Sequence, residues 1–244
     1  MRPLLRWLVL VVAAALALQV FFVARIALMV VVDPQSTAFQ RSEAWRIWRA
    51  RGSVPWRQQW VPYDQISEQL KRAVIASEDD GYSSHEGIDW EALEKAWQKN
   101  SRAEEQAARR AATGKAALVR SPKVVGGSTI TQQLAKNLLL SGERNLLRKG
   151  QELVLTLLLE TLLDKRRILE IYLNSVEWGE GVFGAQAAAE HYYRKSAARL
   201  SAFEAARLAV MLPRPKYFEK LPNSGYLSSR AATIAARMAD ARLP

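Results

Sequence analysis

Residues 126–137 read Gly-Gly-Ser-Thr-Ile-Thr-Gln-Gln-Leu-Ala-Lys-Asn, the most informative run in the chain. The two glycines let the backbone approach a ligand closely, and the hydroxyls then open a helix whose N-terminus favours anions. We expect this helix to cover residues 129–140. Along it, Gln133, Lys136 and Asn137 are three and four residues apart, so they share one face. Two amides and an ammonium on one face suit a sugar phosphate better than a core.

A second helix is expected at residues 146–163, where leucines occupy so many positions that little of the surface can face water. Arg144, Arg148 and Glu152 fall at intervals of four around its start, beside Lys149. If these residues formed ion pairs on an exposed helix surface, each pair would contribute only roughly a few tenths of a kcal/mol to helix stability. Glu152, however, lies where the helix becomes apolar nearly all round, and burying an unpaired charge is costly. We therefore expect a paired Glu152 in the basic wall of a site.

A cluster of acids follows the helix expected at residues 63–78. Residues 76–89 read Ala-Ser-Glu-Asp-Asp-Gly-Tyr-Ser-Ser-His-Glu-Gly-Ile-Asp. Neighbouring carboxylates raise one another's pKa, which is one way for an enzyme to obtain a base near neutral pH. Glu78 is the candidate, with Asp79, Asp80 and Glu86 expected to raise its pKa. The alternative is an ordinary solvated acidic turn.

The remaining patterns also indicate helices. Helical periodicity or start signals mark residues 90–97, 165–174 and 201–212, and no strand-like alternation of any length occurs. Residues 98–123 are rich in Ala, Arg, Lys and Glu but poor in large apolar side chains, so we expect a solvated loop or a frayed helix there. The predicted fold class is mainly α.

Composition narrows the class of partner. The chain has 244 residues, enough for one or two domains, and a formal net charge of +11. Such a charge indicates an anionic partner, which can be nucleic acid, lipid headgroups or phosphate. Cysteine is absent, which excludes disulfides and thiolate sites. The two histidines, His85 and His191, are far apart in sequence, so a histidine-based metal site is not expected.

The N-terminal segment is long enough to cross a membrane. Residues 7–24 carry no charge, Gln19 is their only strongly polar member, and the apolar run resumes after Arg25 as far as residue 32. Arg25 would then lie near one interface. A cleaved signal peptide is the alternative, because Ala15-Leu16-Ala17 resembles a cleavage site. The run continues well beyond that point, which favours a retained anchor.

The segment after the anchor is rich in tryptophan and arginine. Trp45, Trp48, Trp56 and Trp60 lie among basic residues, a composition that suits either the headgroup region of a membrane or an amphipathic helix packed on a domain. We divide the chain into a cytoplasmic stub and anchor at 1–34, a juxtamembrane segment at 35–62 and a globular domain at 63–244. Arg residues on both sides of the anchor give only a weak preference for a cytoplasmic N-terminus.

Four motifs resemble those of family 51 glycosyltransferases and follow one another along the chain in the order found in that family. The resemblance covers about residues 63–215. The motifs are Glu78-Asp79 with His85 and Gly87, the Gly-Gly-Ser-Thr-Ile-Thr-Gln-Gln run at 126–133, Arg148-Lys149-x-x-Glu152, and Arg-Ile-Leu-Glu-Ile-Tyr-Leu-Asn at 167–174. The glycine-rich residues 179–184 extend the match. Within the family the chain most resembles the monofunctional biosynthetic peptidoglycan transglycosylases, because no Ser-x-x-Lys or Lys-Thr-Gly of a transpeptidase domain occurs.

The resemblance implies a lysozyme-like helical domain on the periplasmic side of the bacterial inner membrane, polymerising lipid II into glycan strands. It makes Glu78 the general base for the acceptor 4-hydroxyl, with inversion at the donor's anomeric carbon and undecaprenyl diphosphate as leaving group. Glu152 is the second catalytic carboxylate, and Lys136 and Arg144 stabilise the diphosphate. The other substrate-binding positions are Ser128, Thr129, Gln133, Asn137, Arg148 and Lys149.

The resemblance leaves cofactor and protein partners open. A divalent cation (Mg²⁺ or Mn²⁺) at the diphosphate and contacts with other cell-wall synthases or division proteins fit the family, and no residue decides either. Tyr82 stands where the family usually has Phe, a mild change provided that its hydroxyl reaches water.

Two other functions compete. A lytic enzyme that cleaves glycan strands needs an acid but little cationic machinery for a diphosphate, so Lys136, Arg144 and Arg148 disfavour it. A membrane-tethered binder of nucleic acid or anionic lipid leaves Glu78 and Glu152 without a role. We therefore expect lipid II, the growing lipid-linked strand and the membrane as partners, and no nucleic acid.

Overall fold

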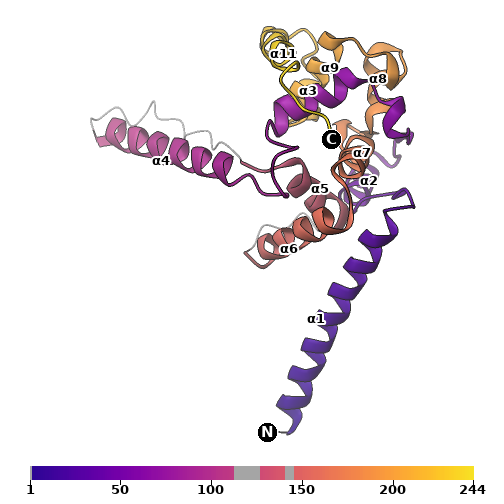
Figure 1. Cartoon of the computed structure of the whole chain (residues 1–244), viewed down its shortest axis with the longest axis vertical. Coiled ribbons are helices and arrows are strands. Elements are labelled where there is room, and N and C mark those ends of the chain that lie inside the picture. Colours follow the sequence, from indigo (N-terminus) through magenta and orange to yellow (C-terminus); the bar gives the residue numbers. More distant parts are fainter. Residues whose placement is uncertain (1, 113–126, 141–145) are drawn as a thin grey trace.

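A computed structural model of the chain describes residues 2–112, 127–140 and 146–244. The described part is mainly helical, which confirms the predicted fold class. A head, which we define as the described residues from 33 onward outside α4, lies at one end of the long helix α1 (Arg2–Leu28), and α4 (Trp90–Ala112) projects from the head (Figure 1).

Helix α1 has the length and composition of a membrane span. Residues 3–28 form the candidate segment, with a mean hydropathy of 2.6. Its first two thirds are exposed, whereas Phe22, Ile26 and the following Met29 are buried against the head. The apolar helix was predicted, although it ends at Leu28, and turns replace it in the remaining apolar residues.

Helices α3 (Glu68–Glu78), α5 (Ile130–Leu139), α6 (Leu146–Leu162), α7 (Lys165–Ser175) and α9 (Ala202–Met211) form the centre of the head. They match the helices predicted from sequence to within a few residues, because their start signals are local. Thr129 and Gln132 form a capping box at α5, and Ser201 and Glu204 form another at α9. A 3-10 turn, η1 (Tyr63–Gln65), precedes α3. Buried leucine, isoleucine and alanine side chains join these helices into one core.

The other elements complete the head. They are α2 (Ala38–Arg51), α8 (Ala185–Tyr193), η3 (Ala197–Arg199), α10 (Pro215–Phe218) and α11 (Gly225–Arg237), with strands β1 (Arg57–Gln58), β2 (Glu177–Gly179) and β3 (Val182–Phe183). The strands form a small sheet in the order β1-β3-β2, in which β1 and β3 are parallel. Gly181, at the β2–β3 turn, has φ 75°, and a Cβ there would lie 2.0 Å from the Pro55 carbonyl oxygen. Only glycine fits this turn.

Residues 98–112 continue α4 as helix, so of the two expected alternatives the loop is wrong for these residues. Ala, Glu, Gln, Lys and Arg all have high helix propensity, so the tract is helical without apolar packing. Side-chain contacts four residues apart add support, from Lys95 to Glu91 and from Gln98 to Glu94. Residues 113–123 of the same tract lie outside the described residues.

Helix α2 packs against the head, which favours the amphipathic-helix interpretation of the tryptophan-rich segment. Gln40 and Ile47 are buried, and Gln40 Nε2 donates to the Ser175 carbonyl at 3.1 Å. Trp45 and Trp48 stack on each other with their ring centroids 5.0 Å apart, and both are exposed. The outer face of α2 therefore presents two aromatic rings while its inner face belongs to the head.

Candidate active site

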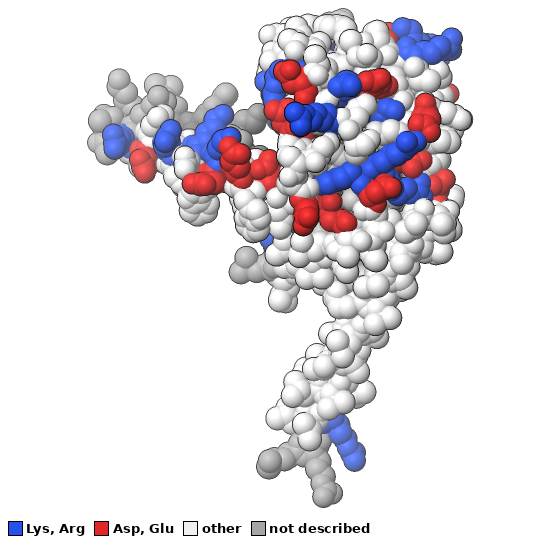
Figure 2. Space-filling view, in the orientation of Figure 1, with Lys and Arg blue, Asp and Glu red and all other residues white. Residues whose placement is uncertain are grey.

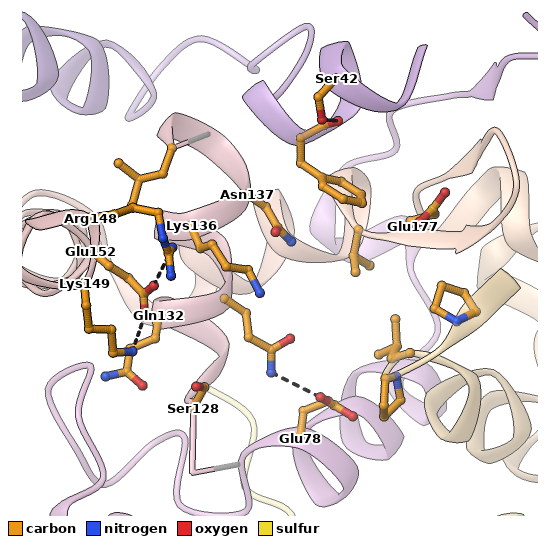
Figure 3. A pocket seen from close by; sticks show the side chains of 17 residues that line it. Ser42, Glu78, Ser128, Gln132, Lys136, Asn137, Arg148, Lys149, Glu152 and Glu177 are labelled. Carbon is orange, nitrogen blue, oxygen red and sulfur yellow. Dashed lines mark hydrogen bonds and ion pairs between the residues drawn. The ribbon is translucent and has the colours of Figure 1, made fainter. Parts of the chain in front are cut away.

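A cavity of about 710 Å³ opens in the head between α2, α3, α5 and α6 (Figure 3). It brings together eight of the ten site residues predicted from sequence: Glu78, Ser128, Gln133, Lys136, Asn137, Arg148, Lys149 and Glu152. They come from three segments spread over residues 78–152, so the fold assembles the motifs into one place.

Of the two remaining predicted residues, the described Thr129 does not line this cavity. Thr129 is buried, and its hydroxyl caps α5 by accepting from Gln132 N and donates to the Gly87 carbonyl at 2.7 Å. The hydroxyl of Thr129 therefore joins two motifs, and the prediction that Thr129 binds substrate stays a prediction. Arg144 lies outside the described residues.

Glu78 is the last residue of α3, and its carboxylate faces the cavity. Burial is the main cause that raises its pKa, hydrogen bonds from Gln133 and Ser77 lower it, and Asp79 adds a smaller upward effect. The predicted direction is right, but the predicted cause is wrong, because Asp79 is a minor contributor. Asp79 is turned away, hydrogen-bonded to His85 and to Ile130 N, both at 2.8 Å.

The amide of Gln133 fixes the orientation of Glu78. Its Nε2 donates to Glu78 Oε2 at 3.1 Å, and its Oε1 accepts from the Tyr172 hydroxyl at 3.0 Å. Since Tyr172 is buried on α7, it holds Gln133 with the amide nitrogen towards Glu78. The carboxylate is therefore set in one place on the cavity wall.

The opposite wall is basic. Glu152 is only 4% exposed and is paired as predicted, with Arg148 Nη1 at 3.0 Å from Oε2 and Lys149 Nζ at 2.5 Å from Oε1. Lys136 reaches from α5 into the space between this group and Glu78 (Figure 3). Because Glu152 holds two cations, the wall keeps a net positive charge towards the cavity.

Sequence reasoning missed the contribution of α2 and of the segment after α7. Phe39 and Ser42 line the cavity from α2, and Glu177 lines it from β2. Glu177 is buried, which raises its pKa to about 7 despite Lys216 Nζ at 3.2 Å. The sequence did offer a signal for Glu177, because an acidic residue shortly after the motif that ends at Asn174 is a candidate site residue. Nothing in the sequence places Phe39 or Ser42 near Glu78.

Among the described residues, Asp79, His85 and Asp89 have donor atoms close enough to share a metal ion. Their donor atoms are already used within the protein: His85 Nε2 bonds to Asp79, His85 Nδ1 accepts from Gly87 N at 3.1 Å, and Asp89 accepts from Ala92 N at 2.8 Å. These bonds hold the acidic segment in shape. In the cavity, each carboxylate oxygen of Glu152 is paired with a cation, so this side chain is not free to bind a metal ion.

The departure from the family pattern at Tyr82 is explained by a local bond. The hydroxyl of Tyr82, expected to reach water, instead donates to the Lys165 carbonyl at 2.7 Å, and the ring is fully buried. The extra oxygen is therefore satisfied inside the protein.

Comparison with known proteins gives one consistent result. A family model described as Transglycosylase matches residues 49–239. The chain is 53% identical to a biosynthetic peptidoglycan transglycosylase of Burkholderia thailandensis, over 247 residues that cover 100% of this chain and 90% of that protein. Proteins of the same name from Burkholderia orbicola (53% identity, 95% of this chain, 87% of that protein) and Burkholderia lata (51%, 98% and 92%) are similar to it as well.

Proposed function

The chain belongs to the transglycosylase family, and on this premise we propose that Glu78 is the general base of an inverting transfer from lipid II. It is a peptidoglycan glycosyltransferase, and its substrates are lipid II or a glycan strand. The observation that carries the proposal is the position of Glu78 across one cavity from the basic wall of Lys136, Arg148 and Lys149.

The acceptor sugar binds with its 4-hydroxyl next to Glu78. The carboxylate takes the proton as the oxygen attacks the anomeric carbon of the donor from the face opposite the leaving group, so the new glycosidic bond has inverted configuration. Gln133 keeps the carboxylate aimed at the hydroxyl throughout. A raised pKa suits this role, because a carboxylate that holds its proton more strongly is a stronger base.

The bond from the anomeric carbon to the diphosphate breaks, and its electron pair leaves with undecaprenyl diphosphate. Fixed cations stabilise the charge that develops there, and Lys136, Arg148 and Lys149 supply them without rearrangement. Glu152 acts by holding Arg148 and Lys149 in place rather than as a second base, since each of its oxygens is bound to a cation. Ser128 and Asn137 complete the polar wall.

The positive charges of Lys136, Arg148 and Lys149 also affect whether polymerisation needs a metal ion. Mg²⁺ or Mn²⁺ at the diphosphate would add to the positive charge from the side chains, and Glu152 would need to leave Arg148 or Lys149 in order to bind it. We propose that the side chains carry the main part of the stabilisation. Polymerisation that continues in EDTA supports this, and complete loss restored by Mg²⁺ or Mn²⁺ assigns the role to the ion.

We propose that α1 holds the chain in the inner membrane with the cavity on the periplasmic side. Helix α1 is uncharged along most of its length, and charged side chains gather on the head and α4 (Figure 2). Lipid II presents its sugars at that membrane surface while its polyprenyl chain stays in the bilayer. Because α2 lines the cavity, residues 35–62 contribute to the site as well as joining it to the anchor.

The test uses the purified full-length chain in liposomes with labelled lipid II. Lipid-linked polymer from the parent, and none from Glu78→Gln, supports the proposal. Fragments released from pre-formed strands instead would indicate a lytic enzyme. The anomeric configuration of the new linkage, read by NMR, separates inversion from retention.

A further inference from the structure

One face of the anchor helix is covered and the rest is exposed. Gln19, Phe22, Ile26 and Met29 are spaced by three, four and three residues, which places them on a single helical face. Phe22, Ile26 and Met29 are buried in the core of the head, and Gln19 is half-buried. The anchor is therefore packed against the catalytic head along its side, and does not merely end at it.

The polar contact on this face is a reciprocal pair of amides. Gln19 Nε2 donates to Gln151 Oε1 at 2.9 Å, and Gln151 Nε2 donates to Gln19 Oε1 at 3.2 Å. Gln19 is the one strongly polar residue among residues 7–24. An amide within an apolar span is costly unless it is hydrogen-bonded, so the bilayer strengthens the preference of Gln19 for this one partner.

Gln151 adjoins the basic wall. It precedes Glu152 on α6, and consecutive helical side chains point about 100° apart, so Gln151 faces the anchor while Glu152 faces the cavity. Arg148 and Lys149 lie less than one turn earlier on the same helix. A rotation or tilt of this part of α6 would move all three charged groups relative to Glu78.

Several described side chains in the first turns of α6 face away from the head. Leu147 is 88% exposed, and a Cβ at Gly150 would meet nothing within 4 Å. Leu153 and Val154 on the following turn are exposed as well. Glycine within a helix also lowers its local stability. On its side towards α1, the start of α6 is joined to the anchor by the amide pair with Gln19.

We propose that Gln19 is a positioning residue of the active site: through its amide pair with Gln151, the anchor helix holds the start of α6 so that Arg148, Lys149 and Glu152 face the departing diphosphate. This inference rests on the role assigned to those three residues in the proposed function. A second attachment fixes the end of the anchor, where Arg167 donates to the Met29 carbonyl and pairs with Asp33, each at 2.7–2.8 Å. Two attachments at different depths set both the rotation and the tilt of α1 against the head.

A double-mutant cycle tests the pair in the full-length chain in liposomes. We expect Gln19→Leu and Gln151→Leu each to reduce kcat for polymerisation by at least about fivefold, since each leaves the other amide unpaired in an apolar setting. The double variant should return to within about twofold of the parent, because replacing both partners by apolar groups of similar size removes the unpaired amide. The matched control is Val20→Leu, on the exposed side of α1, which should equal the parent.

The outcomes are decisive in both directions. Single variants that equal Val20→Leu would overturn the proposal. So would a double variant slowed by the product of the two single losses, because the amides would then act separately, whereas a double variant no slower than either single variant keeps them coupled. Membrane partition should stay at the parent value, and the loss of kcat should persist at temperatures where circular dichroism shows the single variants fully folded. A purely structural role would lower kcat only through the unfolded fraction.

A cross-linking experiment tests the contact without relying on activity. The chain has no cysteine, so Gln19→Cys combined with Gln151→Cys carries the only two thiols. A short thiol cross-linker should join them in membranes, and Val20→Cys with Gln151→Cys should cross-link far less. Cross-linking with no preference for position 19 would overturn the contact. If the parent made no polymer, the proposed function would fail while this result still decided whether the anchor holds α6.

Discussion

At Glu78, burial and hydrogen bonding act on one pKa in opposite directions. Burial raises it, and the amide of Gln133 lowers it by bonding to the ionised form. A base works only when it is ionised, so polymerisation should rise with pH as Glu78 loses its proton. Gln133→Leu removes the bond that favours the ionised form. We expect the acidic limb of the rate profile to move to higher pH, measured with saturating lipid II between about pH 4 and 8.

A matched variant separates this effect from simple damage. Tyr172→Phe leaves Gln133 in place but removes the hydroxyl that orients its amide, so it should move the limb in the same direction by a smaller amount. A limb that stays fixed in both variants, or one that moves to lower pH, would show that Glu78 is not the titrating base.

Replacing Glu78 itself should separate activity from stability. Glu78→Gln keeps the shape and the bond to Gln133 but cannot take a proton, so the rate should fall by roughly 10²- to 10⁴-fold. A carboxyl whose pKa is raised on folding stabilises the protein below its unfolded pKa, and this contribution is lost as pH rises through the folded pKa. At pH 8 the ionised group therefore opposes folding. The amide variant should melt no lower than the parent in calorimetry at that pH.

Parental turnover by Glu78→Gln would contradict the assignment. Glu152 would be a poor replacement as base, because Arg148 and Lys149 hold its two oxygens. Glu177, with a pKa of about 7 and a place on the cavity wall, would become the better candidate.

Lys136 offers a test of the leaving-group side. It is proposed to meet charge that develops only as the diphosphate departs, so Lys136→Ala should reduce kcat by roughly 10²- to 10³-fold, about 3–4 kcal/mol of barrier. The KM for lipid II should change much less. Lys95→Ala, on the exposed face of α4, is the control for loss of one positive charge and should leave the rate unchanged. Equal rates in the two variants would remove Lys136 from the mechanism.

At the scale of elements, helices with local start signals could be predicted and the others could not. Capping boxes mark the starts of α5 and α9, and each lies within four residues of sequence: Thr129 with Gln132, and Ser201 with Glu204. Strands β1 to β3 are two or three residues long and are stabilised by pairing with one another. They are too short to show the alternation of polar and apolar residues that predicts a strand. Helix α4 was underestimated because the prediction weighed apolar content, whereas propensity alone extends the helix to Ala112.

The same distinction applies to the site. Glu78, Gln133, Lys136 and Glu152 belong to motifs whose spacing is visible in the sequence. Phe39 and Ser42 reach the cavity only because α2 folds back on α5 and α7, and that depends on bonds between residues more than 100 apart, such as Gln40 with Ser175. Long-range contacts of this kind have no signature in a single sequence.

Helix α2 should therefore behave as part of the catalytic head. Gln40 is buried, its Oε1 accepts from Thr37 N at 2.8 Å, and its Nε2 donates to Ser175. Gln40→Leu would leave these groups unpaired, at a cost of about 1–3 kcal/mol each when buried. We expect a lower melting temperature together with slower polymerisation. Arg49→Ala, on the exposed face of the same helix, should change neither, and a stable but slow Gln40→Leu would mean that α2 affects catalysis without supporting the fold.

At the scale of the whole molecule, the charges of α1 set where it can lie in a membrane. Arg6 and Arg25 enclose the uncharged residues 7–24, and the rise from one to the other is about 28 Å for a helix. This rise is close to the hydrocarbon core thickness of about 30 Å, and each guanidinium can reach its interface by extending the side chain away from the core. If α1 is retained and the head is periplasmic, Leu4 faces the cytoplasm and Gln35 lies outside.

Single cysteines in this cysteine-free chain test that arrangement directly. Gln35→Cys and Leu4→Cys both replace exposed residues, one beyond each end of the uncharged run. A membrane-impermeant maleimide applied to spheroplasts should label Gln35→Cys alone, and permeabilised cells should show both. Labelling of Leu4→Cys alone in intact spheroplasts would place the cavity in the cytoplasm, away from the proposed acceptor strand. Loss of the Leu4→Cys thiol from the mature chain, with Gln35→Cys found in soluble protein, would show that the segment is a cleaved signal peptide. The contact between Gln19 and Gln151 could not then exist in the working enzyme.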